Sequence, residues 1–374
     1  MARINTALVV GAGTAGTAAA MLLARRGVAT DLIELRDDVG ALGSGITVQG
    51  NALRVLRQLG VYEEAARHGY AFTTLGFRAA DGTLLAEIDD VRTGGPDLPA
   101  TVGMERPRLA SLLVDAAVDS GVKLRFGTTV DELTPRGDAV DVRMSDGQTA
   151  TYDLVVGADG VRSHVRDLLG IELTTEPVGM GIWRVFTGRP PSITRTDLCY
   201  DGPEHIAGFC PTGDDSLYAY LVEDACDRSG LSAEQGLEIM RAKAAAYGGP
   251  WDEIRARMVD PDRVHHTHFE HHLLPRPWHR GRIVLIGDAV HVSPPTLAQG
   301  AAQALEDAVA LDDELANHDD PDAALDAFGA RRFGRAKLVG ETSVALCRLM
   351  QAGDPDRQIP AVIGRTLGAL CEPA

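Results

Sequence analysis

The feature that most constrains this chain lies in its first thirty-five residues. A short apolar run is followed by Gly11, Gly13 and Gly16, and then by a segment rich in alanine and leucine. A second apolar run follows and carries Glu34 near its end. This order of strand, G-x-G-x-x-G turn, helix, strand and acid is typical of a dinucleotide-binding βαβ unit.

Each residue of this pattern has a physical task. Gly11 permits a tight turn, Gly13 lets the backbone approach a pyrophosphate, and Gly16 lets the helix pack closely on the strand. The helix N-terminus offers free N–H groups and a partial positive charge to phosphates. Glu34 can accept a hydrogen bond from a ribose hydroxyl. The alternative is a glycine-rich turn that only packs, and the motif does not tell which dinucleotide binds.

Composition excludes several classes of function. The chain has 374 residues and a formal charge of −17, which disfavours nucleic acid and anionic membrane surfaces as partners. No apolar run is long enough to span a bilayer, and the N-terminus leads straight into a strand without a signal peptide. The cysteines are scattered and form no C-x-x-C pair, which favours a cytoplasmic location; they are Cys199, Cys210, Cys226, Cys347 and Cys371.

The rest of the chain predicts a discontinuous cofactor domain. Short strands and one helix dominate 172–272, whereas Ile283–Ile286 returns to the buried style of a parallel strand and is followed by long helices. We therefore expect an α/β fold with a Rossmann-like domain formed by 1–171 and 273–374. A β-rich substrate domain, 172–272, is inserted in it, and 72–100 is a candidate for the same sheet.

Two later stretches add chemistry to the first turn. One reads LVVGADGVRSHVR and places Asp159 at the carboxyl end of a strand, where α/β proteins bind ligands. The other reads IVLIGDAVHVSPPTLAQGAAQALEDA and delivers Asp288 in the same way. Its carboxylate can accept a hydrogen bond from a sugar or ribitol hydroxyl. The N–H groups near Gly300 and Ala301 can stabilise negative charge on a ring.

In this order, the three motifs resemble those of the group A flavoprotein monooxygenases, the para-hydroxybenzoate hydroxylase family. The resemblance extends over about residues 5–345. Gly45-Ile46 and Asn51-Ala52-Leu53 are similar to the subset that contains salicylate, 3-hydroxybenzoate and urate hydroxylases. The W-x-W-x-I-P signature of flavin halogenases and the C-x-x-C of thiol-type flavin reductases are both missing from the sequence.

The resemblance implies that FAD, not NAD, occupies the first turn. The cofactor-binding residues carried over are Gly11, Gly13 and Gly16 for the pyrophosphate, Glu34 for the ribose, Arg106 and Asp159 for further FAD contacts, Asp288 for the ribitol, and Gly300 and Ala301 for the isoalloxazine edge. Asp159 is also implied in contacts with NAD(P)H. The chain departs from the family at Ala298 and Ala302, where the family often has glycine and asparagine, so a side-chain contact near the flavin is missing or replaced.

The resemblance also implies a reaction. NADH or NADPH reduces FAD, O₂ adds to form a C4a-hydroperoxide, and a small phenolic or heteroaromatic substrate is hydroxylated. One alternative is epoxidation or oxidative tailoring of a larger natural product by the same chemistry. Another, of a different class, is a non-catalytic flavin-binding ligand sensor or chaperone. The assembly is expected to be a monomer or a homodimer.

Substrate residues are predicted less directly than cofactor residues. The inserted sheet should cover the flavin, and Tyr218 and Tyr220 alternate onto one face of a strand. Arg184 could pair with a substrate carboxylate or with an aspartate of the protein, and His205 is a candidate base that deprotonates the substrate. For each residue the alternative is simple packing. The full set of candidates is Trp183, Arg184, His205, Phe209, Tyr218, Tyr220 and Pro295.

The sequence also contains a run of histidines that invites a metal site. On a strand, His266, His268 and His272 would share one face. The run lacks a carboxylate-and-water arrangement, and the family that the chain resembles uses no metal. We therefore expect a polar sheet surface here and no metal. His291, which follows the Gly-Asp motif, is expected to be structural.

Overall fold

A six-stranded, mostly parallel sheet carries the motifs of the sequence. The protein is described by a computed structural model that covers residues 4–39, 45–353 and 358–374. All strand pairs of this sheet are parallel except the first. In spatial order its strands are β18 (His279–Arg280), β19 (Ile283–Leu285), β12 (Leu154–Gly157), β1 (Thr6–Val10), β2 (Ala29–Ile33) and β8 (Lys123–Arg125). The predicted α/β fold class is confirmed, since three distant segments meet as neighbouring strands.

The first turn is as tight as its glycines suggest. Gly11 has a φ of +103°, and a Cβ on it would lie 2.5 Å from the carbonyl oxygen of Ala158. A Cβ on Gly16 would lie 1.9 Å from the carbonyl oxygen of Gly11, so neither position admits a side chain without a backbone shift. Helix α1 (Thr14–Arg25) already includes Gly16, whereas the sequence predicts that the helix begins after this glycine, at Thr17. Because glycine is a poor helix former, the composition hid that Gly16 lies in the first turn.

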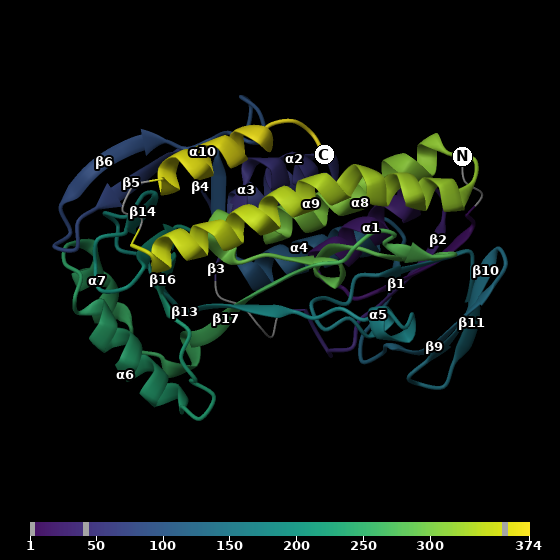
Figure 1. Cartoon of the computed structure of the whole chain (residues 1–374), viewed down its shortest axis with the longest axis horizontal. Helices are drawn as coiled ribbons and strands as arrows, with labels where there is room; N and C mark the ends of the chain where they lie inside the picture. The colour runs from purple at the N-terminus through teal and green to yellow at the C-terminus, as the bar shows by residue number, and fades with distance from the viewer. Residues whose placement is uncertain (1–3, 40–44, 354–357) are drawn as a thin grey trace.

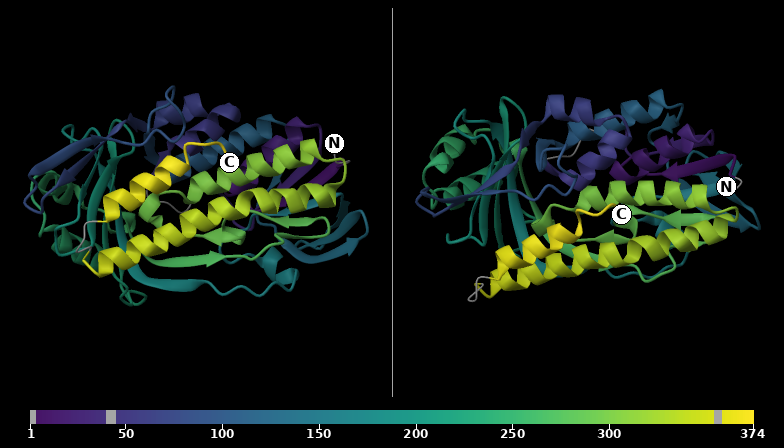
Figure 2. Two further views of the ribbon diagram at one scale, coloured as in Figure 1. Left: turned by 45° about the horizontal axis from the view of Figure 1, so that its top comes forward. Right: turned by 90° about the horizontal axis from the view of Figure 1, so that it is seen from above.

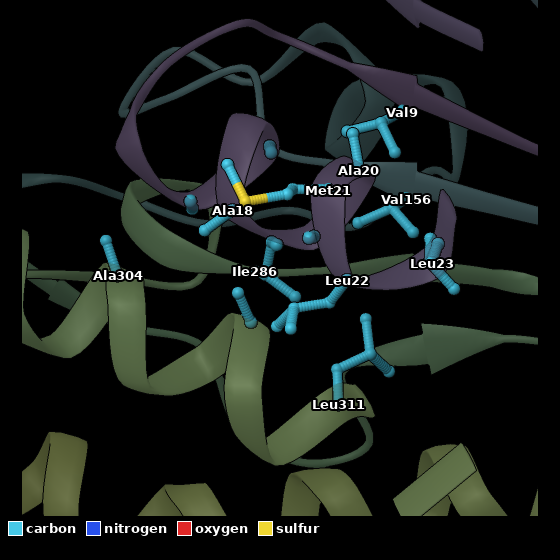
Figure 3. Close-up of a cluster of buried hydrophobic side chains, with 14 of the residues drawn as sticks. Val9, Ala18, Ala20, Met21, Leu22, Leu23, Val156, Ile286, Ala304 and Leu311 are labelled. Atoms are coloured by element: carbon cyan, nitrogen blue, oxygen red, sulfur yellow. The ribbon is translucent and has the colours of Figure 1, made fainter. Parts of the chain in front are cut away.

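The core of this domain lies where α1 and α8 (Gly300–Asn317) pack together against the sheet (Figure 3). Val9, Val156 and Ile286 come from the sheet side and are completely buried. Alanines on the helices, among them Ala18, keep the side chains short at the contact, so the two helix axes can approach closely. Each fully buried aliphatic side chain contributes about 1.5–3 kcal/mol, so this contact stabilises the domain substantially.

A second, eight-stranded sheet forms the other end of the molecule (Figures 1 and 2). Its long central strands pair antiparallel, and the hairpin around Asp81-Gly82 joins its edge. The assignment of 72–100 to the substrate domain stays a prediction. In spatial order the strands are β20 (His291–Val292), β17 (Val264–Leu273), β13 (Glu176–Gly188), β16 (Ser216–Asp224), β15 (Ile206–Pro211), β14 (Thr196–Cys199), β5 (Thr74–Arg78) and β6 (Leu84–Asp89).

The two faces of this sheet have different neighbours. In β13 to β16 the odd-numbered side chains pack against α6 (Ala233–Ala244) and α7 (Pro250–Arg257) in one apolar cluster. The even-numbered side chains face the C-terminal helices and the cofactor domain in other clusters. The registers make this possible, because every pair across these four strands joins residues of the same parity. Helix α7 was not predicted, since it has only eight residues and half of them are charged.

Smaller elements complete the fold. Two three-stranded sheets consist of β11 (Thr149–Tyr152), β10 (Ala139–Met144) and β9 (Val130–Arg136), and of β3 (Gly45–Gln49), β7 (Thr101–Glu105) and β4 (Tyr70–Phe72). The remaining helices before the C-terminal part are α2 (Gly50–Gln58), α3 (Tyr62–His68), α4 (Arg106–Asp119) and α5 (His164–Leu168). The strand β3 and helix α2 connect the cofactor domain to the eight-stranded sheet.

The long helix α9 (Pro321–Gln351) runs beside α8 and on past the eight-stranded sheet, so it spans both parts of the molecule (Figure 2). Helix α10 (Ile359–Ala369), which was not predicted, turns back along α9. Among the residues that the structure describes, no helix is long and apolar enough to cross a membrane. The domain boundaries proposed from the sequence stay a prediction, because α9, which they assign to the cofactor domain, also packs against β13 and β17 of the eight-stranded sheet.

Candidate active site

The first turn leaves room for a pyrophosphate. No atom lies within 4 Å of where a Cβ on Gly13 would be, and Gly13 is the N-cap of α1. The first turn of α1 contains no acidic residue, and no side chain caps its N–H groups. A glycine next to open space at an uncapped helix N-terminus is the arrangement that binds phosphate. Glu34 lies beside this turn, just after β2, where its carboxylate accepts hydrogen bonds from Ala12 N–H at 2.8 Å and Arg36 N–H at 3.0 Å.

Asp159 has a local structural task. Its carboxylate accepts a hydrogen bond from the hydroxyl of Ser163 and another, at 2.9 Å, from the N–H of Val165 at the start of α5. Gly160 then turns the chain with a φ of +85°. Both carboxylate oxygens therefore hold the turn, and each keeps a further lone pair for a ligand. The predicted contacts of Asp159 with FAD and NAD(P)H stay a prediction.

Asp288 lies in the short turn η2 (Gly287–Ala289), after β19. The residue is exposed, yet the protein around it is dense enough that burial raises the pKa of its carboxyl. The backbone of this turn is fixed from two sides. Gly287 donates its N–H to Asp307 at 2.8 Å, and the carbonyl of Asp288 contacts Nε2 of His272 at 3.0 Å.

His272 is a site residue that the sequence did not reveal as one. Burial lowers its pKa to about 4, so the ring is neutral at pH 7. Its Nδ1 lies 2.8 Å from the hydroxyl of Thr175, and its Nε2 faces the carbonyl of Asp288. A neutral ring with Nε2 protonated satisfies both contacts, since the Thr175 hydroxyl can donate to Nδ1. His272 thus holds the Asp288 turn, and no sequence signal distinguished it from its neighbours in the histidine run.

The remaining histidines do not gather into a metal site. His266 and His268 contact each other edge to face, with ring centroids 5.1 Å apart, whereas His272 lies at the Asp288 turn. The three rings therefore do not gather at one point, although all three lie at even-numbered positions of β17, and their shared face stays a prediction. His291 bonds Asp307 at 2.7 Å. Within the described ranges, no group of three or more His, Cys, Asp or Glu side chains could hold a metal ion.

The turn before α8 has an unusual backbone. After η3 (Pro295–Leu297), Ala298 has a φ of +51°, the left-handed region that favours glycine. This explains why the resembled family often has glycine there. The side chain of Gln299 is buried and points toward α2, where it bonds Asn51. No atom lies within 4 Å of where a Cβ on Gly300 would be, so the N-terminus of α8 faces open space, as a flavin edge requires.

Arg184 and two tyrosines lie together on the even-numbered face of the eight-stranded sheet. Nε of Arg184 donates to the hydroxyl of Tyr218 at 3.1 Å, and the rings of Tyr218 and Tyr220 stack with centroids 5.2 Å apart. Gly45 of β3 packs directly on Tyr218, and the charge of Arg106 acts on both Tyr218 and Asp288. This face of the sheet therefore meets the cofactor motifs at Arg106.

Tyr200 belongs to the same face and was missed. It follows β14, shares even parity with Leu198, and packs in the cluster that contains Tyr220. Burial raises the pKa of Tyr200 to about 12 and that of Tyr220 well above its ordinary value. Within the described part of the chain neither hydroxyl has a hydrogen-bond partner. A single tyrosine after a short strand gave no sequence pattern that could have revealed it.

Three predicted substrate residues lie elsewhere. Trp183 and Phe209 are on the odd-numbered face, where they are buried against α6 and α7, so they do not line the site. Trp183 instead donates its indole N–H to Glu223 at 3.0 Å. His205 lies just before β15 and pairs with Asp224 at 2.9 Å, at the end of the sheet beside Gln351. These corrections follow from strand parity, which the sequence alone did not fix for β13 and β15.

Comparisons with known proteins agree with this geometry. The family model described as "FAD binding domain" matches residues 5–343. A putative FAD-dependent monooxygenase, YetM of Bacillus subtilis, is 31% identical over 369 residues, 98% of each chain. The chain belongs to the FAD-binding monooxygenase family. It is an FAD-dependent flavoprotein monooxygenase, which decides against the non-catalytic sensor or chaperone.

Two further similarities refine this placement. The 2-heptyl-3-hydroxy-4(1H)-quinolone synthase of Pseudomonas aeruginosa (strain PAO1) is 31% identical over 313 residues, 82% of this chain and 79% of that protein. The crystal structure of Klebsiella pneumoniae HpxO complexed with FAD and uric acid superposes with a TM-score of 0.86 at 21% identity, covering 98% of this chain and 95% of the other. This second likeness confirms the fold.

The open space at Gly13 yields a direct prediction. Gly13→Val should fold normally, because nothing lies near its Cβ, but it should bind FAD at least about a hundredfold more weakly, since the side chain occupies the phosphate space. Gly334→Val, in the exposed middle of α9 and equally free of contacts, is the control and should bind FAD like the wild type. Titration of the apoprotein with FAD, together with melting temperatures, measures both. Unchanged affinity in Gly13→Val would refute this placement of the pyrophosphate.

His272 predicts a pH dependence of stability. The pKa of His272 in the folded protein, about 4, lies below its ordinary value of 6.5. Between pH 4 and 6.5 the ring is therefore protonated in the unfolded chain but neutral in the folded chain. Stability should therefore fall as pH drops from 6.5 to 4, and His272→Gln should flatten this slope. The exposed control His265→Gln should keep it. Burial also lowers the pKa of His266, so part of the slope remains in His272→Gln. Equal slopes in His272→Gln and wild type, in chemical denaturation at several pH values, would contradict the assignment.

Proposed function

We propose that this protein hydroxylates a small heteroaromatic or phenolic ring that carries an acidic group. The observation that supports this proposal is the hydrogen bond from Arg184 to Tyr218. Both residues lie on the face of the eight-stranded sheet that meets Arg106 and the Asp288 turn. The quinolone synthase relative supports a heteroaromatic ring, since its name describes a 3-hydroxylated quinolone. Bound FAD supplies the oxygen-activating chemistry, with NADH or NADPH as the reductant.

Arg184 is suited to an anionic substrate. It is half-buried, and among the described ion pairs no carboxylate of the protein neutralises it. Among the described residues, Arg184 donates hydrogen bonds to two hydroxyls, those of Tyr218 and Thr267, and its other N–H groups are suited to bind a ligand. A half-buried cation that is held in place by neutral groups favours an anionic ligand, because the ligand supplies the missing charge.

Tyr200 and Tyr220 are suited to bind an oxygen on the ring of the substrate. Burial keeps both phenols protonated at neutral pH, so each can donate a hydrogen bond to a hydroxyl or oxyanion of the substrate. The ring of Tyr220 lies against Gly208 of β15, where a Cβ would come within 2.5 Å of it, so its position is fixed. The aliphatic and aromatic side chains around the two phenols exclude water from the ring.

We also propose a cytoplasmic location and a monomeric or homodimeric assembly. All five cysteines are free, and three of them are buried, which is consistent with the reducing cytoplasm. We propose a monomer or a homodimer in which each chain holds a complete site, because every cofactor motif and the substrate face belong to one chain.

The proposal is tested by turnover. Purified protein reconstituted with FAD should oxidise NADH or NADPH faster when a hydroxypyridine carboxylate or hydroxybenzoate is present, and the product should contain one added oxygen. Peroxide and product are measured together, since a non-substrate ligand can stimulate oxidation without oxygen transfer. A broad panel of such acids that gives no hydroxylated product would refute the proposal.

The larger-substrate alternative has one supporting observation. The cluster around Tyr200 and Tyr220 continues through aliphatic residues of β13 and β15 to α9 and α10, which suits an alkyl chain attached to the ring. The same assay decides between the two, with 2-heptyl-4-quinolone compared with the acidic rings. Efficient coupling with the quinolone, and none with the acids, would favour this second candidate.

The anion-binding role of Arg184 predicts a specific kinetic defect. Arg184→Met should raise KM for an acidic substrate about tenfold or more, with a smaller change in kcat, because a charge-assisted hydrogen bond is lost in ground and transition states alike. The KM of an uncharged phenol should change much less. The control Arg189→Met removes an arginine that stacks on Tyr70 just beyond the end of β13. An equal rise in KM for charged and uncharged rings would argue against anion binding.

A further inference from the structure

A buried polar network lies behind the turn that faces the flavin site. Its centre is Glu306 on α8, which is 2% exposed. Arg335 of α9 donates two hydrogen bonds of 2.7 Å to this carboxylate, and Arg332 donates a third at 3.2 Å. Asn51 of α2 donates a fourth at 3.0 Å. Two arginines balance Glu306 and the adjacent Asp307, so the charges are paired although they are far from water.

On one side the network holds the turn before α8. The Asn51 carboxamide donates to Gln299 at 3.0 Å and to Glu306 at 3.0 Å, so one side chain joins the two. Gln299 directly follows Ala298, whose left-handed backbone costs on the order of 1 kcal/mol. That conformation needs external support, and the fixed carboxamide of Gln299 provides it.

On the other side the network reaches the C-terminus. The same Nη2 of Arg335 that bonds Glu306 also donates to the carbonyl of Leu370, at 3.1 Å, where α10 ends. A guanidinium that bridges a buried carboxylate and a helix C-terminus is favourable at both ends, because each carries negative charge. One unbroken series of hydrogen bonds therefore runs from Leu370 through Arg335, Glu306 and Asn51 to Gln299.

We propose that Asn51, Glu306 and Arg335 are positioning residues that couple docking of the C-terminal segment to FAD binding at the turn of Ala298 to Gly300. The segment 359–374 then acts as part of the cofactor site without touching the cofactor. By linkage, the coupling is reciprocal: FAD should stabilise the docked segment as much as docking strengthens FAD binding. This inference rests on the FAD site and not on the identity of the substrate.

Arginines one turn apart on α9 give a matched test. Arg331, like Arg335, binds the C-terminal residues, through the carbonyl of Ala374, but its other partners are Asp313 and Glu314, outside the network. Arg335→Met should raise the Kd for FAD about tenfold, the size of a lost buried charge-assisted hydrogen bond. Arg331→Met should change it less than about twofold. An equal rise in both variants would overturn the proposal, because the effect would then be loss of C-terminal order in general.

Hydrogen exchange separates coupling from mere structural support. In the wild type, adding FAD to the apoprotein should slow amide exchange in 359–374. The side chain of Asn51 forms its hydrogen bonds with Thr93, Gln299 and Glu306, outside that segment. In Asn51→Ala this protection should be lost while the melting temperature of the apoprotein stays near the wild type. Exchange in 359–374 that is insensitive to FAD in the wild type would overturn the proposal.

A double variant adds a control for folding. If Asn51 and Arg335 act through the same carboxylate, Asn51→Ala combined with Arg335→Met should weaken FAD binding no more than about twofold beyond the worse single variant. If the rise in Kd in the double variant equals the product of the rises in the two single variants, Asn51 and Arg335 act independently, and the proposed coupling would be overturned. Because every readout uses FAD alone, a failed substrate screen would leave this test unaffected.

Discussion

The buried pairing of Asp307 with Arg332 is the interaction on which the flavin half of the site depends. Burial alone would raise the pKa of Asp307, but the charges of His291 and Arg332 outweigh it and lower the pKa to about 2. The ionised carboxylate then holds the Gly287 amide, and with it the Asp288 turn. Removing either charged partner would leave an uncompensated charge in the interior, which typically costs about 3–5 kcal/mol. Neighbouring residues of α8 thus support two predicted cofactor motifs: Asp307 holds the Asp288 turn, and Glu306 holds Gln299 through Asn51.

Much of the cofactor site could be predicted because its physics is local. The tight turn at Gly11, the close packing at Gly16 and the acid at a strand end each follow from neighbouring residues, and the structure has each where the pattern placed it. The helix α1 and the strands β12 and β19 were found for the same reason. The roles of individual residues toward FAD stay predictions, since local geometry shows room and charge but no contact.

The substrate side resisted prediction because its information is not local. Trp183 and Arg184 are neighbours in sequence, and only the registers of β13 decide that the first packs on α6 while the second faces the site. Tyr200 and His272 gained their positions from partners more than fifteen residues away in sequence, such as Tyr220 and Asp288. Helix α7, with eight residues of which half are charged, is too short to give a clear periodic signal.

The constant parity of the four central strands has a consequence for evolution. Even-numbered residues of β13 to β16 face the proposed substrate site, and odd-numbered ones pack toward α6 and α7. If that site is correct, substrate preference and sheet packing depend on alternate residues of the same strands. A lineage can exchange side chains such as those of Arg184, Tyr218 and Tyr220 without disturbing the packing beneath them. New substrates can then be explored at little risk to the fold, which suits a family whose members act on many different rings.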